Sequence, residues 1–165
     1  MSIDPLPVMT PDHPDLAALA AAFAAVPKPA PLVGRKGSYD DAESDAFDAI
    51  EDWAGVTPEI LFSAYEGLII MGPAAAHFVL PHLIRVICLH RRRNEAADNF
   101  LSHVDSWLTG PNRWDLVPRL TPVQRAALLD ILSAMDRAFY SPSGSDRAGA
   151  VAEAFAAIPP RHDLP

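Results

Sequence analysis

The chain contains little from which covalent or metal cross-links are built. Its 165 residues include one cysteine, Cys88, which excludes an internal disulfide and a multi-cysteine metal site. No segment shows a convincing alternation of apolar and polar residues, so the sequence carries no clear strand signal. The first residues lack the basic and apolar regions of a signal peptide. We therefore expect an all-α protein of the reducing cytoplasm, with no metal and no other cofactor.

Basic residues are also few. The chain has 13 Lys and Arg against 21 Asp and Glu, which gives a formal net charge of -8. This balance disfavours nucleic acids and anionic membrane surfaces as partners, because both repel an acidic protein. It is compatible with a basic protein partner, and it gives no indication of the oligomeric state.

Half of the residues are hydrophobic, and prolines and glycines divide them into segments with helical periodicity. A chain of this length forms one domain. We expect a single compact bundle of six or seven helices over residues 14–158, with a flexible arm at 1–13, a linker rich in proline and glycine at 27–38, and a tail at 159–165. The predicted helices cover about residues 14–26, 39–53, 58–68, 73–92, 95–108, 122–139 and 146–158.

Helix starts have the clearest local signals. Thr57 precedes Pro58, and Thr121 precedes Pro122; threonine caps a helix, and proline is tolerated at its first position. Gln124 follows Thr121 by three residues. This spacing predicts a capping box, in which each side chain bonds the other residue's backbone N–H.

An uncharged run of 18 residues lies between Glu66 and Arg85. Its length is at the lower limit for a membrane-spanning helix. Prolines and histidines interrupt it, and the amphipathic helices predicted on either side need an apolar surface to bury against. We therefore expect no membrane span. The run instead predicts a buried central helix over about 73–92, kinked at Pro81, whose nitrogen cannot donate a hydrogen bond.

Catalytic and metal-binding motifs are missing. No two of the six histidines have the helical spacing of three or four that a shared metal needs, and no G-x-S-x-G elbow occurs. Cys88 lies among aliphatic residues and is expected in the core. We therefore expect a protein that is not an enzyme. The remaining enzymatic alternative is a pocket formed by Glu66, His77, His82 and Arg85.

The segment 40–52 contains seven acidic residues and no basic one. Like charges four residues apart destabilise a helix, and a basic partner would offset that repulsion and associate faster. A solvated surface is the alternative interpretation. The predicted partner-binding face of this helix consists of Asp41, Asp45, Asp48 and Asp52.

The pieces Ala22-Phe23, Val26-Pro27 and the run from Pro73 to Leu83 resemble segments of an uncharacterised family of small all-α bacterial domains. The similarity covers about residues 20–135 and departs at Ala75, where relatives often have an acidic residue, and at 77–79, where they have paired tyrosines. The resemblance implies an all-α domain of bacterial origin and implies no reaction. The matching residues are Ala22-Phe23, Val26-Pro27, Trp53, Leu61, Leu68, the run from Pro73 to Leu83, Thr121, Gln124, Leu128 and Leu132.

Three functions follow as hypotheses. The first is a non-enzymatic protein that binds a basic protein through the acidic helix, as an immunity protein binds a toxin. The second is an operon-encoded interaction or scaffold domain with a groove beside the Pro81 kink. The third is a small enzyme built around the pocket residues named above.

Overall fold

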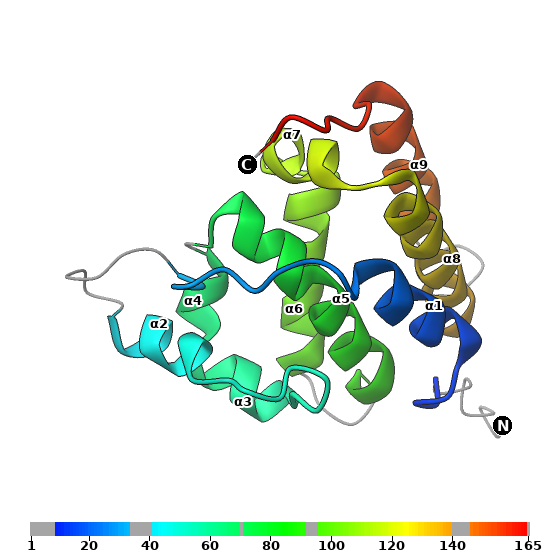
Figure 1. The fold of residues 1–165 in the computed structure, drawn as a ribbon. Helices are drawn as coiled ribbons and strands as arrows, with labels where there is room; N and C mark the ends of the chain where they lie inside the picture. The colour runs from blue at the N-terminus through cyan, green and yellow to red at the C-terminus, as the bar shows by residue number, and fades with distance from the viewer. Residues whose placement is uncertain (1–8, 34–40, 70, 92–95, 140–145, 165) are drawn as a thin grey trace, which may run out of the picture.

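The computed structural model describes residues 9–33, 41–69, 71–91, 96–139 and 146–164. All regular structure in these ranges is helical, which confirms the predicted all-α class (Figure 1). The α-helices are α1 (Pro14–Phe23), α2 (Asp41–Asp48), α3 (Pro58–Ser63), α4 (Tyr65–Ile69), α5 (Pro73–His90), α6 (Ala96–Leu108), α7 (Arg113–Leu116), α8 (Pro122–Phe139) and α9 (Arg147–Ala157), with a 3₁₀ turn η1 (Val117–Arg119) before α8.

Helix α5 is the central element of the bundle. It packs against α1, α6 and α7. Among the described helices it alone is long and apolar enough to cross a membrane, and 61% of it is buried within the fold. A core helix of a globular bundle has this same pattern. Its fully buried side chains are Val79, Leu80, Leu83, Ile84, Val86, Ile87 and Cys88.

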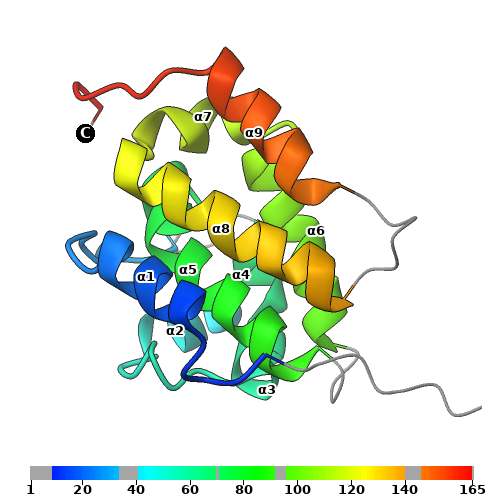
Figure 2. The ribbon, with the colours of Figure 1, turned by 90° about the vertical axis from the view of Figure 1, so that its right-hand side faces the viewer.

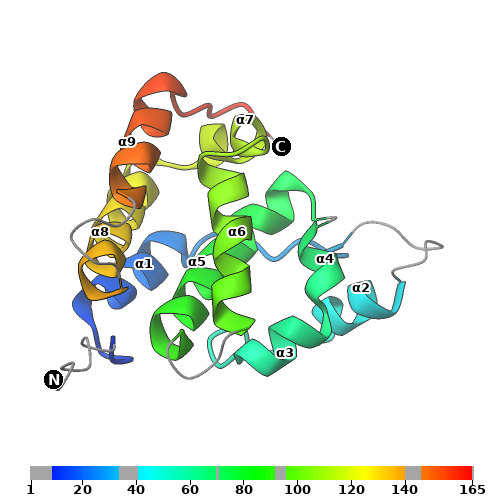
Figure 3. The same cartoon turned by 180° about the vertical axis from the view of Figure 1, so that it is seen from behind.

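The other helices form two groups on either side of α5 and α6. Helix α8 contacts both α1 and α9, and Figure 2 shows these three in front of the central helices. Helix α2 contacts α3 and α4, and Figure 3 shows this group at the opposite edge of the molecule. The α1–α8–α9 group and the α2–α4 group therefore lie on opposite sides of the two central helices.

Two predicted helices are shorter than their sequence patterns indicated. The helix expected over 39–53 ends at Asp48, and the Lys28 side chain binds the carbonyls beyond its end. The helix expected over 58–68 is divided at Ala64, which leaves the helical conformation. The short helix α7 and the turn η1 lie in a stretch with no predicted structure, because helices of three or four residues carry too little periodicity to detect.

The predicted arm, linker and tail are partly packed. Residues 1–8 and 34–40 lie outside the described part of the chain. Met9 is buried, as are Leu32 and Val33, so the described half of the linker crosses the bundle as an anchored segment. In the tail, the Arg161 backbone N–H donates to the Pro118 carbonyl at 2.8 Å.

Candidate functional site

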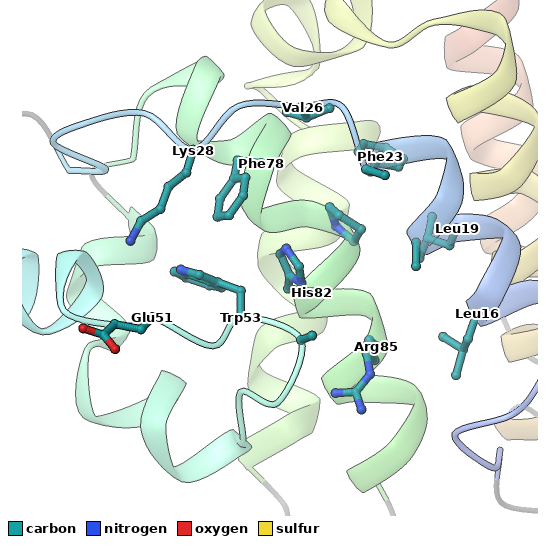
Figure 4. A pocket seen from close by; sticks show the side chains of 14 residues that line it. Leu16, Leu19, Phe23, Val26, Lys28, Glu51, Trp53, Phe78, His82 and Arg85 are labelled. Carbon is teal, nitrogen blue, oxygen red and sulfur yellow. The ribbon is translucent and has the colours of Figure 1, made fainter.

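A groove with a volume of about 380 Å³ lies beside Pro81. Four segments form it: α1, the chain that follows it at 24–28, the loop at 51–54 and the middle of α5. Figure 4 shows the α1 side chains facing the α5 side chains across it. Its apolar walls include Leu16, Leu19 and Phe23 from α1 and Phe78 and Pro81 from α5.

Small residues leave this space open. Leu16, Leu19 and Phe23 repeat at helical spacing, so all three project from one face of α1. Ala20 on α1 and Ala54 in the loop also line the groove, and neither side chain is long enough to fill it. The groove is therefore a consequence of alanines placed between larger residues.

Trp53 forms the wall opposite α1. Its ring stacks on Phe47 at a centroid distance of 5.9 Å and meets Phe78 edge-on at 5.5 Å. Both are favourable aromatic geometries. Phe47 is fully buried and supports one face of the Trp53 ring. Trp53 itself is 5% exposed, so it is part of the core as well as of the groove wall.

His82 and Arg85 are one helical turn apart on α5, and both line the groove. The His82 ring packs against Trp53, at a centroid distance of 5.6 Å, and against Phe78, at 5.2 Å. Burial, and then the charge of Arg85, lowers the pKa of His82 to about 4. The imidazole is therefore neutral at pH 7.

Arg85 is the uncommitted cation of this site. Its side chain is half-buried, and within the described residues no hydrogen bond or ion pair engages it. Lys28 differs, because its ammonium donates to the Asp48 and Ile50 carbonyls at 3.2 and 3.1 Å. Glu51 is exposed, and Figure 4 shows it on the opposite side of Trp53 from Arg85.

The predicted pocket of four residues is only partly assembled. His82 and Arg85 share the groove, whereas His77 faces other neighbours: its Nε2 lies 3.0 Å from Gln124 Oε1, and its ring meets Phe23 edge-on. Burial lowers the pKa of His77 also. The Glu66 side chain lies outside the described part of the structure. Residues five apart on a helix point about 140° away from each other, which separates the two histidines.

The predicted acidic stripe is not one helical face. Because α2 ends at Asp48, Asp52 lies beyond it in a turn, where its Oδ1 accepts from the Gly55 N–H at 3.0 Å. Asp48 Oδ1 accepts from the Leu32 N–H at 2.6 Å and so anchors the buried 32–33 segment. Asp45 is exposed, and the Asp41 side chain lies outside the described residues. The stripe is thus divided between a structural carboxylate and exposed ones.

Metal and thiol chemistry find no support in the described ranges. No group of three or more His, Cys, Asp or Glu side chains gathers there as metal ligands would. Cys88 is buried, as its aliphatic neighbours indicated, and burial raises the pKa of its thiol to about 12. Such a thiol is not a nucleophile at neutral pH.

Most groove residues could not be identified as a site from the sequence. The sequence pattern predicts only a buried helix face for Leu16, Leu19 and Phe23. It predicts only the end of another helix for Trp53. No local signal connects them to Arg85, because the three segments are separated by tens of residues. Pro81 was the one indication, since a proline within a predicted helix marks an irregular surface.

No protein-family model, curated protein or solved structure matches this chain.

Proposed function

We propose that this protein is a non-enzymatic binding protein whose ligand site is the groove beside Pro81. The observation that carries the proposal is a groove of about 380 Å³ with apolar walls and one uncommitted cation. Ligand sites are typically clefts of roughly 300–1,000 Å³ lined mainly by apolar side chains with a few polar groups. The groove matches this description in size and in lining.

The chemistry of the groove supports binding over catalysis. General acid–base catalysis needs a titratable group that changes charge near the working pH and lies within hydrogen-bond reach of its partner. Burial lowers the pKa of His82 to about 4, so its imidazole, packed against two aromatic rings, is neutral near pH 7. Among the described groove residues no hydrogen bond joins two titratable side chains.

Filling the groove with a tryptophan should block it. Ala20 lines the groove and is exposed, so Ala20→Trp places an indole in the space while leaving the core intact. We expect the uncharged dye Nile red to bind the unmodified protein and to bind Ala20→Trp at least about tenfold more weakly, a loss of about 1.4 kcal/mol. Dye fluorescence in a titration measures this.

Ala18→Trp is the matched control. Ala18 is an exposed residue of the same helix, but it does not line the groove. Two residues along a helix amount to a rotation of about 200°, so its indole points away from the site. Equal dye affinity in the two variants, with both melting temperatures unchanged, would contradict the proposal.

The acidic surface supports a second candidate, the binding of a basic protein such as a toxin. Asp45 is exposed on α2, and Glu51 and Asp52 are exposed just beyond its C-terminal end. The partial negative charge of a helix C-terminus adds to that of these carboxylates and attracts cations. These three exposed carboxylates favour the candidate; Asp48 is not among them, because its carboxylate binds the Leu32 N–H.

Reversing the exposed charges tests this candidate. Asp45→Lys with Glu51→Lys should weaken binding of a decalysine peptide, which stands in for a basic protein, on the order of tenfold at low salt. Asp130→Lys with Glu153→Lys is the control, because it changes the net charge equally at exposed sites on α8 and α9. If both pairs weaken binding alike, as measured by calorimetry, the acidic surface has no specific role.

A further inference from the structure

The groove places one cation among apolar walls. Arg85 contributes a half-buried guanidinium that no carboxylate engages within the described residues. His82, one helical turn away on α5, lines the same groove, and its neutral imidazole supplies no negative charge. A partly desolvated charge without a counter-ion is unfavourable, so an anion bound there would be stabilised.

The geometry of arginine favours a carboxylate. A guanidinium presents parallel N–H donors that match the two oxygens of a carboxylate, and such charge-assisted pairs are stronger than neutral hydrogen bonds. The rest of the lining is mainly apolar and therefore favours an apolar part of the ligand. Leu16, Leu19 and Phe23 lie across the space from Phe78, and an apolar chain or ring placed between these walls would leave water for an apolar surface.

We propose that the groove binds a small amphipathic monoanion, an apolar chain or ring that carries one carboxylate. Arg85 holds the carboxylate, and the walls from α1 and α5 enclose the apolar part. This inference rests on the proposed function and adds the chemical class of the ligand. The proposed function requires only that the groove binds a ligand, whereas the proposed ligand class also requires a preference for negative charge.

The acidic surface of the protein does not exclude an anionic ligand. Exposed charges are screened over about 8 Å at physiological ionic strength. Glu51, the acidic residue that lines the groove, lies across Trp53 from Arg85 and is exposed to solvent. The local charge at the α5 side of the groove is therefore positive.

Three probes with eight carbons each test the inference on the full-length protein: octanoate, octanol and octylamine. We expect octanoate to bind about tenfold more tightly than octanol, which corresponds to one charge-assisted pair, and octylamine to bind most weakly. Calorimetry gives the affinities. Trp53 lies in the wall, so a change in tryptophan fluorescence that Trp53→Phe removes reports binding at this site.

Arg85→Gln should remove the preference. The octanoate affinity is expected to fall about tenfold while the octanol affinity changes by less than about twofold. Arg85→Lys keeps the charge without the paired donors, so its octanoate affinity should lie between those of the unmodified protein and Arg85→Gln. Arg137→Gln, at an exposed arginine on α8, is the matched control and should leave all three affinities unchanged.

The outcomes separate the two proposals. If octanoate and octanol bind alike, or if Arg85→Gln binds octanoate as the unmodified protein does, the ligand class is wrong and the binding groove stands. If octanoate fails to bind while Nile red still binds and Ala20→Trp blocks it, the same conclusion holds. If neither octanoate nor Nile red binds, both proposals are overturned.

Discussion

Replacing Arg125 with methionine is expected to lower the free energy of unfolding by about 3 kcal/mol or more. Arg125 is 8% exposed, and three backbone carbonyls accept hydrogen bonds from its guanidinium. Methionine fills most of the volume and donates none of these bonds. The accepting carbonyls belong to Val117 at 2.7 Å, Phe155 at 2.9 Å and Leu120 at 3.1 Å.

The size of the effect follows from the position of those carbonyls. A buried polar group left without a partner costs about 1–3 kcal/mol. Leu120 follows the 3₁₀ turn η1, and Phe155 lies in the last turn of α9, where carbonyls have no partner within the helix. Val117 begins η1, and its carbonyl also accepts from the Leu120 N–H at 3.2 Å. Arg125 therefore joins α8, η1 and α9. The guanidinium also lies 5.1 Å from the centre of the Phe155 ring.

Urea unfolding measures this effect, and two further variants bracket it. Arg125→Lys keeps the charge but cannot supply donors in three directions, so we expect an intermediate loss. Arg137→Met, at an exposed position of the same helix, should change stability by less than about 0.5 kcal/mol. A value for Arg125→Met inside that range would show that the three bonds contribute nothing net.

Replacing Gln124 with leucine is expected to destabilise the protein by about 2 kcal/mol. Gln124 is 4% exposed and completes the capping box that the sequence predicted: its Oε1 accepts from the Thr121 N–H at 3.1 Å, and its own N–H donates to Thr121 Oγ1 at 3.2 Å. The side chain also reaches two other helices. Its Nε2 donates to the Ala22 carbonyl in α1 at 3.3 Å, and its Oε1 lies 3.0 Å from His77 Nε2 in α5.

Gln124→Glu separates the two roles of this side chain. Glutamate still accepts at the cap but cannot donate to the Ala22 carbonyl, so it should recover part of the loss. Thr121→Ala removes the other half of the box, and the double variant with Gln124→Leu should be less unstable than the sum of the singles. Exact additivity in urea unfolding would mean that the two caps act independently.

The helices were largely predictable because their signals are local. The starts of α5 and α8 at Pro73 and Pro122, and the confirmed capping box, each depend on residues within one turn of each other. The errors have a common cause. At the end of α2 the Asp48 carbonyl accepts from Lys28, which is twenty residues away, and no local pattern predicts such a contact.

The candidate site divides in the same way. Arg85 and His82 were predicted as pocket residues, and a groove was predicted separately beside Pro81; the two coincide because all three residues lie within two turns of one helix. His77 was grouped with them by proximity in sequence, but it faces α1 and α8 instead. Asp48 was assigned to a partner surface, because nothing in the sequence places the Leu32 N–H against its carboxylate.

The sequence by itself determined an all-α chain with a buried central helix, since helical periodicity, caps and prolines act over a few residues. Only the tertiary structure decided that a groove exists. Its walls come from Leu16, Trp53 and Phe78, which meet only when α1 and the 51–54 loop pack on α5. The space between them depends on the sum of many side-chain volumes across distant segments, and the small alanines that leave it open look the same in sequence as any others.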